Sequence, residues 1–142
     1  MYKGTVLSSS SGGDKMHRND AIDTITFYFE SWVENDFSKF SRVIHDEAIV
    51  RECTGAIIEG KDELRKWFTQ WNENGNRVVH WIIEYIGFDK ESVSAFVEWK
   101  FKCIFEGKEY EWNGASIVYF RDSLIVELNE YEMKQEKFFP YR

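Results

Sequence analysis

Proline, cysteine and long apolar runs are scarce in this chain, and each shortage excludes a class of protein. Pro140 is the only proline among 142 residues, so long helices and strands can run without interruption. Cys53 and Cys103 are the only cysteines, which predicts two free thiols and a cytoplasmic protein rather than a disulfide framework. No apolar run approaches the roughly 20 residues of a transmembrane helix, and we identify no secretory signal.

Basic clusters and cofactor motifs are missing as well. The formal net charge is −7 and the basic residues are scattered singly, so we expect neither nucleic acid nor an anionic membrane as a partner. The glycine-rich motifs of nucleotide-binding loops and the nucleophile elbow of serine hydrolases are absent. His17, His45 and His80 lack the spacing of metal ligands. The sequence therefore predicts no metal and no cofactor.

Aromatic residues are abundant by contrast. Phe, Trp and Tyr make up 18% of the chain, with 6 Trp. So many rings predict a core too bulky to close fully, or aromatic faces that a ligand or a second subunit covers. The length predicts a single domain, which we place at residues 16–142. Residues 1–15 are expected to form a flexible tail, because their Ser- and Gly-rich stretch cannot bury apolar surface.

Helices are expected in the first half of the domain and strands in the second. Apolar spacing predicts helices from the expected cap Asp20 to about Asn35, over residues 37–44, and from Gly60 to a stop at Gly75. A short strand is expected at residues 48–53. After Gly75 the period changes to two, which predicts strands at about residues 77–88, 93–105, 108–120 and 124–133 with short hairpin links. The predicted fold is α+β, a curved, mostly antiparallel sheet of about five strands wrapped on three N-terminal helices.

Several segments resemble SnoaL-like proteins of the nuclear transport factor 2-like superfamily, which have a cystatin-like cone fold. The segments are HDEAIV at 45–50, a glycine at 55, IEGKDEL at 58–64, VEW at 97–99, WNGAS at 112–116 and LIVELNEY at 124–131. Together they span roughly residues 20–133. The resemblance implies a cone-shaped cavity and frequent dimers. Members include ketosteroid isomerases, polyketide cyclases, dehydratases and epoxide hydrolases, so the fold does not fix a reaction.

Glu130 carries the most specific part of this resemblance. Its place before Tyr131 is similar to that of an acidic residue on the last strand of the epoxide hydrolases. Those enzymes also use an arginine and a second acid on a neighbouring strand. The nearest matches here are Lys100 and Glu98, and a lysine does not replace an arginine for bidentate carboxylate binding.

Glu52, Glu98 and Glu130 are the candidate catalytic bases. Glu98, Lys100 and Glu130 could form a buried charge cluster, in which a desolvated carboxylate accepts protons near neutral pH. The alternative is a stripe of solvated charges on the outer face of the sheet. Glu52, at the edge of the cavity, could take a proton from a carbon next to a carbonyl of a bound molecule. The alternative for Glu52 is a surface salt bridge with Arg51 or a lysine.

Aromatic side chains are the candidate ligand contacts, because ligand pockets are chiefly apolar with few polar groups. We expect the lining to include Tyr28, Trp32, Trp67, Trp71 and Trp112. The leading functional hypothesis is a pocket protein that binds a small apolar molecule. The alternatives are a cofactor-independent isomerase, cyclase, dehydratase or hydrolase with a carboxylate base, and a non-catalytic dimeric interaction module.

The strand faces predict a homodimer. Three helices can cover only one face of the sheet, yet apolar residues fall on both faces of the run at 77–88. Another copy of the chain would cover the second face. We therefore expect light scattering at high protein concentration to give the mass of a dimer, and a monomer throughout would contradict this prediction.

Overall fold

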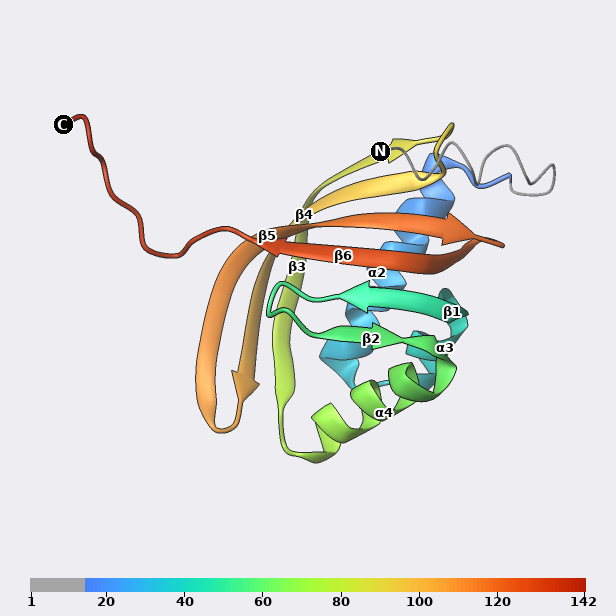
Figure 1. Cartoon of the computed structure of the whole chain (residues 1–142), viewed down its shortest axis with the longest axis horizontal. Coiled ribbons are helices and arrows are strands. Elements are labelled where there is room, and N and C mark those ends of the chain that lie inside the picture. The colour runs from blue at the N-terminus through green and yellow to red at the C-terminus, as the bar shows by residue number, and fades with distance from the viewer. Residues whose placement is uncertain (1–14) are drawn as a thin grey trace.

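The structure is a computed structural model that describes residues 15–142, so the predicted tail, apart from Lys15, lies outside the described residues. Figure 1 shows a curved sheet that wraps around one long helix, with two shorter helices at one end. In chain order the elements are α2 (Arg18–Glu34), α3 (Phe37–Val43), β1 (Ile44–Arg51), β2 (Ile57–Glu59), α4 (Gly60–Glu73), β3 (Arg77–Asp89), β4 (Ser94–Phe105), β5 (Lys108–Arg121) and β6 (Leu124–Glu132).

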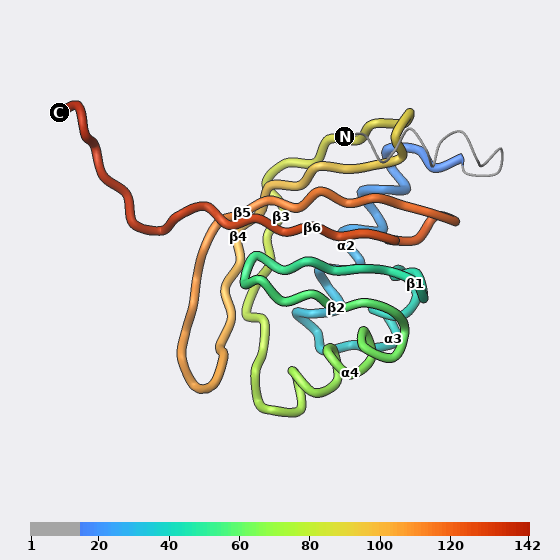
Figure 2. Tube along the Cα trace, in the orientation of Figure 1, coloured from blue at the N-terminus to red at the C-terminus, as the bar shows by residue number. Residues whose placement is uncertain are grey.

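The sheet has the strand order β2-β1-β6-β5-β4-β3. Every neighbouring pair is antiparallel except β1 and β6, which run parallel. The tube in Figure 2 shows β1 and β2 beside β6, and the long β4–β5 hairpin curving away from them. The α+β fold is confirmed, with one strand more than the expected five. The additional strand, β2, has only three residues, too few for a period of two to be detected.

The ends of the helices depend on a few local interactions. Asp20 does act at the start of α2, but from its third helical position, where its carboxylate accepts a 3.0 Å hydrogen bond from the backbone N–H of His17. The cap is therefore His17, three residues before the expected one. Gly75 follows the end of α4 with φ of 85°, and its N–H donates to the carbonyl of Asn72 at 3.1 Å. The predicted stop at Gly75 is thus confirmed.

Two tight turns set the strand registers in the second half. Glu106 and Gly107 join β4 to β5 with φ of 50° and 80°, and Asp122 and Ser123 join β5 to β6 with φ of 55° and 64°. Two positive φ values in a two-residue loop match the hairpin turn whose twist suits paired strands. The second turn lies one residue later than the sequence suggested, since Arg121 still belongs to β5.

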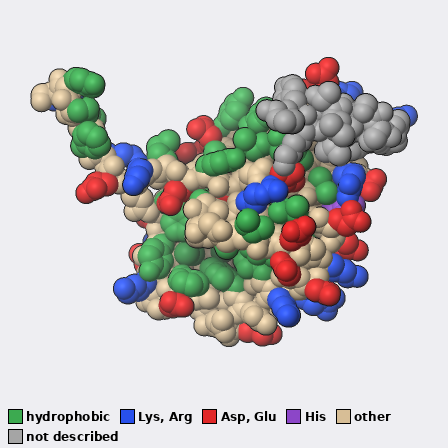
Figure 3. Space-filling view, in the orientation of Figure 1, with side chains coloured by type: hydrophobic (Ala, Val, Ile, Leu, Met, Phe, Trp, Pro, Cys, Tyr) green, Lys and Arg blue, Asp and Glu red, His purple; other side chains and the backbone are tan. Residues whose placement is uncertain are grey.

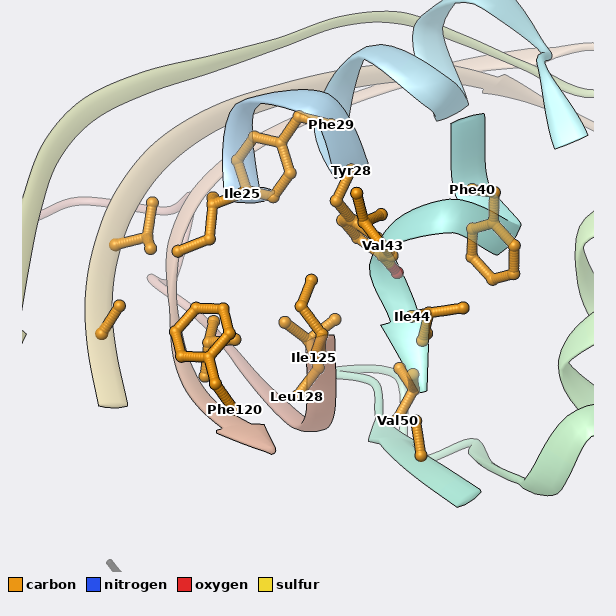
Figure 4. Close-up of a cluster of buried hydrophobic side chains, with 14 of the residues drawn as sticks. Ile25, Tyr28, Phe29, Phe40, Val43, Ile44, Val50, Phe120, Ile125 and Leu128 are labelled. Carbon is orange, nitrogen blue, oxygen red and sulfur yellow. The ribbon is translucent and has the colours of Figure 1, made fainter. Parts of the chain in front are cut away.

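The core fills the end of the sheet that α2 covers. Figure 4 shows side chains from α2, α3 and β1 facing those of β5 and β6. The labelled residues are Ile25, Tyr28, Phe29, Phe40, Val43, Ile44, Val50, Phe120, Ile125 and Leu128, all of them buried. No helix within residues 15–142 is long and apolar enough to cross a membrane.

Gly114 provides the space in which Trp99 packs against the inner face of the sheet. The two residues are cross-strand partners in the β4–β5 pair. A Cβ atom at position 114 would lie 2.5 Å from Cη2 of Trp99 and would also meet the carbonyl oxygen of Tyr131. Trp99 is fixed further by its indole N–H, which donates to Oγ of Ser116 at 2.9 Å. A side chain at position 114 would therefore displace this tryptophan or the backbone of β6.

The outer face of the sheet carries exposed apolar side chains. Ile82 is 48% exposed, Tyr85 59%, Phe96 45% and Tyr131 55%. Charged residues lie between them on the same face, because Ile82 pairs with Lys100 across the strands. A homodimer through this face stays a prediction.

Candidate functional site

A cavity of about 560 Å³ lies between the helices and the inner face of the sheet. Thr54, Phe105 and Tyr110 are exposed and mark its mouth. Figure 3 shows hydrophobic side chains gathered below β6, between the β4–β5 hairpin and α4. The lining consists of Trp32, Glu52, Cys53, Thr54, Trp67, Trp71, Val78, Trp81, Trp99, Phe101, Cys103, Phe105, Tyr110, Trp112 and Glu130.

All six tryptophans of the chain line this one cavity. The predicted lining residues Trp32, Trp67, Trp71 and Trp112 are among them. Tyr28 is not, because its side chain is fully buried in the core behind the wall.

The rings of the wall form two connected groups. On the helix side, the ring centroids of Trp32 lie 4.7 Å from Trp67 and 5.5 Å from Trp71. On the sheet side, Trp81 lies 5.7 Å from Trp99, and Phe101 bridges to Trp112 at 4.9 Å. Trp71 also stacks near Phe105 of β4 at 6.4 Å, a contact between α4 and the sheet at the mouth. Ring contacts at these distances stabilise a defined wall around the hollow.

Trp81 and Trp99 were not expected in the lining. Trp99 shares the inner face of β4 with Phe101, and the alternation of that strand could have identified it. Trp81 could not be placed by alternation, because β3 changes register between Val78 and His80 and again after Ile83. Each irregularity shifts the side chains that follow it to the other face.

Strand register brings Glu52 and Glu130 together. Arg51 at the end of β1 pairs with Asn129 of the parallel strand β6, so the next residue of each strand lies beside the other. Both carboxylates line the cavity. Thr54, in the turn after β1, donates its hydroxyl to Oε1 of Glu52 at 3.0 Å. Two of the three candidate bases thus lie side by side in an apolar hollow.

Burial makes both carboxylates poor acids. It raises the pKa of Glu130 to about 8, and the negative charge of Glu52 adds to the effect. Burial also raises the pKa of Glu52, against the hydrogen bond from Thr54. Glu130 keeps some accessible surface only because its carboxylate faces the hollow. The pair therefore holds a proton near neutral pH, since two adjacent desolvated carboxylates resist ionising together.

The nearest arginine does not neutralise this pair. Arg51 lies one residue before Glu52, but its guanidinium donates to Glu127 at 2.5 Å and to Asn129 at 2.9 Å. Because Arg51 and Asn129 alternate with inward-facing neighbours, these contacts lie on the outer side of the sheet. The salt bridge between Arg51 and Glu52, one of the alternatives for Glu52, does not form.

Glu98 lies outside the cavity. Its side chain is exposed and pairs across the strands with Tyr85, on the outer face. Lys100 lies on the same face and forms an ion pair with Glu84 at 3.6 Å, both side chains being about half exposed. The buried cluster of Glu98, Lys100 and Glu130, one of the two alternatives drawn from the sequence, is therefore absent, because β4 alternates and Glu130 faces inward from β6. Glu98 and Lys100 belong to the solvated outer stripe that was the alternative.

The remaining titratable groups offer little nucleophile or metal chemistry. Burial raises the pKa of Cys53 to about 12, helped by the charge of Glu130, and that of Cys103 to about 11. Both thiols are free and stay protonated at neutral pH. Within residues 15–142 no group of three or more His, Cys, Asp or Glu residues could hold a metal ion. His45 lies in β1, and its Nδ1 accepts a hydrogen bond from the backbone N–H of Glu47 at 3.0 Å.

Several buried polar atoms in and behind the wall have no hydrogen-bond partner among the described residues. They include Nε1 of Trp81 and Trp112. Burial, and then the charge of Glu130, raise the pKa of Tyr28 well above its ordinary value. Tyr28 therefore remains a neutral phenol in the core.

Comparison with known proteins identifies a family match and several similar folds. The SnoaL-like domain model matches residues 25–128. No curated protein matches the sequence. An LEH-like epoxide hydrolase of M. tuberculosis superposes with a TM-score of 0.71 at 15% identity, over 81% of this chain and 84% of that one.

Two further solved structures have the same architecture. A candidate isomerase from Bacillus subtilis has a TM-score of 0.70 at 16% identity, over 81% of this chain and 87% of its own. A protein of unknown function with a cystatin-like fold, from Methylobium petroleophilum PM1, has a TM-score of 0.67 at 21% identity, over 89% and 84%. At these identities the similarity shows the fold alone.

The raised pKa of Glu130 predicts a pH-dependent stability. In the unfolded chain Glu130 ionises near its ordinary value of 4.5, whereas in the folded chain it ionises near 8. Between these values the folded chain holds a proton that the unfolded chain has released. The free energy of unfolding therefore falls as pH rises from about 4.5 to about 8.

In Glu130→Gln this decrease in the free energy of unfolding should be smaller. Urea unfolding at a series of pH values measures the decrease. Glu98→Gln should keep the wild-type slope, and an unchanged slope in Glu130→Gln would contradict the prediction.

Proposed function

The chain belongs to the SnoaL-like domain family, and we propose on that basis that it binds a small apolar molecule in its tryptophan-lined cavity. The observation that carries this proposal is a hollow of about 560 Å³ lined by all six tryptophans. Ligand pockets typically have volumes of about 300–1,000 Å³ and walls of apolar and aromatic groups with few polar ones. The cavity matches this description on each point.

The open volume also separates this proposal from the interaction module. A module that uses the fold only as a scaffold for a partner gains stability from a filled interior, since empty apolar volume is destabilising. Here the bulky rings of Trp32, Trp81 and Trp112 surround space instead of filling it. This favours a ligand as the occupant.

Binding is tested with N-phenyl-1-naphthylamine, an uncharged probe whose fluorescence rises in apolar surroundings. We expect its emission to rise on addition of the full chain and the tryptophan emission to fall, because every tryptophan borders the cavity. Thr54→Trp places a ring at the exposed mouth and should weaken binding about tenfold or more by obstructing entry.

The control for this experiment is Gln70→Trp. Gln70 is exposed on α4 and does not line the cavity, so the same ring added there should leave binding unchanged. Binding in the cavity would be contradicted if the wild-type chain did not raise the fluorescence of the probe. It would also be contradicted if both variants lost the same amount of affinity for the probe.

A second candidate function is proton transfer by Glu130, favoured by the absence of Lys, Arg and His from the lining that residues 15–142 form. A carboxylate that titrates near 8 is tuned for general-base work close to neutral pH. In an isomerisation its oxygen would take a proton from a carbon next to a carbonyl. The electron pair of the broken C–H bond would pass to the carbonyl oxygen as an enolate, and the proton would return to another carbon of the same molecule. This proton transfer within one molecule needs no cofactor.

The ring opening of 5-nitro-1,2-benzisoxazole tests this base without knowledge of the substrate. A base removes the ring C–H proton, the electron pair forms the nitrile, the N–O bond breaks, and a coloured phenolate is released. We expect the chain to accelerate the reaction, with a rate that rises through pH of about 8 as Glu130 ionises. Glu130→Gln should lower the rate about 100-fold.

Two variants make the assignment specific. Glu52→Gln removes the neighbouring charge that raises the pKa of Glu130, so the rate profile should shift to lower pH. Glu98→Gln changes an exposed carboxylate on the outer face and should leave the profile unchanged. A rate that survives in Glu130→Gln would rule out this residue as the base.

A further inference from the structure

We propose that the cavity prefers ligands that carry an ammonium group on an apolar body, an inference that rests on the proposed function of the cavity as a small-molecule site. The charged side chains of the lining have one sign. Glu52 and Glu130 are its carboxylates, and none of the fifteen lining residues is Lys, Arg or His. An anionic ligand finds no partner for its charge in this wall, whereas a cation finds the acidic pair of Glu52 and Glu130.

The groups around Glu130 are acids on each side of it. Glu52 and Cys53 follow β1, Tyr28 on α2 lies behind the wall within reach of its charge, and Glu132 follows it on β6. The paired strand β5 contributes Ser116, which has no charge. A cation beside Glu130 therefore meets attraction from every ionised neighbour. It also removes the repulsion that otherwise keeps the two carboxylates from ionising together.

The aromatic wall attracts a cation independently of the carboxylates. Ring faces carry negative electrostatic potential, and tryptophan is the strongest cation–π partner among the side chains. The ring planes of Trp32 and Trp71 meet at 88°, and those of Trp81 and Trp99 at 89°. An ammonium group would lie against the ring faces that border the hollow.

Four of the six indole N–H groups do not offset this preference. Those of Trp81 and Trp112 are buried in the wall, that of Trp32 is buried beside the hydroxyl of Tyr28, and that of Trp99 donates to Ser116. A ligand oxygen in the cavity consequently finds no accessible donor among these four indoles. The lining presents carboxylate oxygens and ring faces, and an ammonium group on an apolar body uses both.

The test is displacement of N-phenyl-1-naphthylamine from the full chain by two compounds of one shape. Benzyltrimethylammonium carries the charge, and neopentylbenzene has carbon in place of the charged nitrogen. We expect the cation to bind at least about tenfold more tightly. Equal or tighter binding of neopentylbenzene would overturn the ammonium preference and leave the proposed function standing. A chain that binds none of the three compounds would overturn both.

Two double variants locate the source of the preference. In Glu52→Gln/Glu130→Gln the affinity for the cation should fall about tenfold, while that for neopentylbenzene stays the same, which also shows that the variant is folded. Glu84→Gln/Glu98→Gln removes the same formal charge at exposed positions and should keep the preference. If this control loses the preference as well, attraction comes from the net charge of −7 and the cavity is not its source.

Discussion

The cavity exists because the β4–β5 hairpin is longer than the helical layer that it covers. Near Phe120 and Ile125 the inner face of the sheet meets α2 and packs into a closed core (Figure 4). Towards the turn at Glu106 and Gly107, β4 and β5 continue beyond that helix (Figure 1). There the side chains on the inner face of the curved sheet lie across a gap from those of α4. Rings of this size can border the gap and stack at its edges, and they leave its centre open.

The parallel pairing of β1 with β6 determines the chemistry within that gap. An antiparallel neighbour would have brought a different residue beside Glu130. The parallel register aligns Arg51 with Asn129 and so sets Glu52 beside Glu130. The same register directs Arg51 to Glu127 on the opposite side of the sheet. One backbone arrangement thus places two acids inside and their nearest base outside, and the raised pKa values follow from this separation.

The sequence was informative where periodicity is regular and misleading where backbone pairing is irregular. The helical spacing identified Trp32, Trp67 and Trp71, and the family resemblance identified Glu130, all of which line the cavity. Trp81 was missed because apolar residues fall on both faces of the run at 77–88, where two register shifts also interrupt simple alternation. Such irregularities depend on the partner strand, so they leave no periodic signal in the chain itself. The proximity of Glu52 to Glu130 was equally inaccessible, since it depends on a pairing between strands 78 residues apart.

Binding and proton transfer need not be competing functions of this cavity. Without a ligand, burial and the charge of Glu52 hold Glu130 in its protonated form near neutral pH. An ammonium group beside it would stabilise the carboxylate and lower its pKa, because an opposite charge favours the ionised state. The same positive charge would make a nearby C–H bond of the ligand more acidic by stabilising the carbanion. A cationic ligand would therefore generate the base that acts on it, whereas a neutral ligand would meet a carboxylic acid. Under these two proposals the charge of the ligand, more than its shape, would decide which role Glu130 takes.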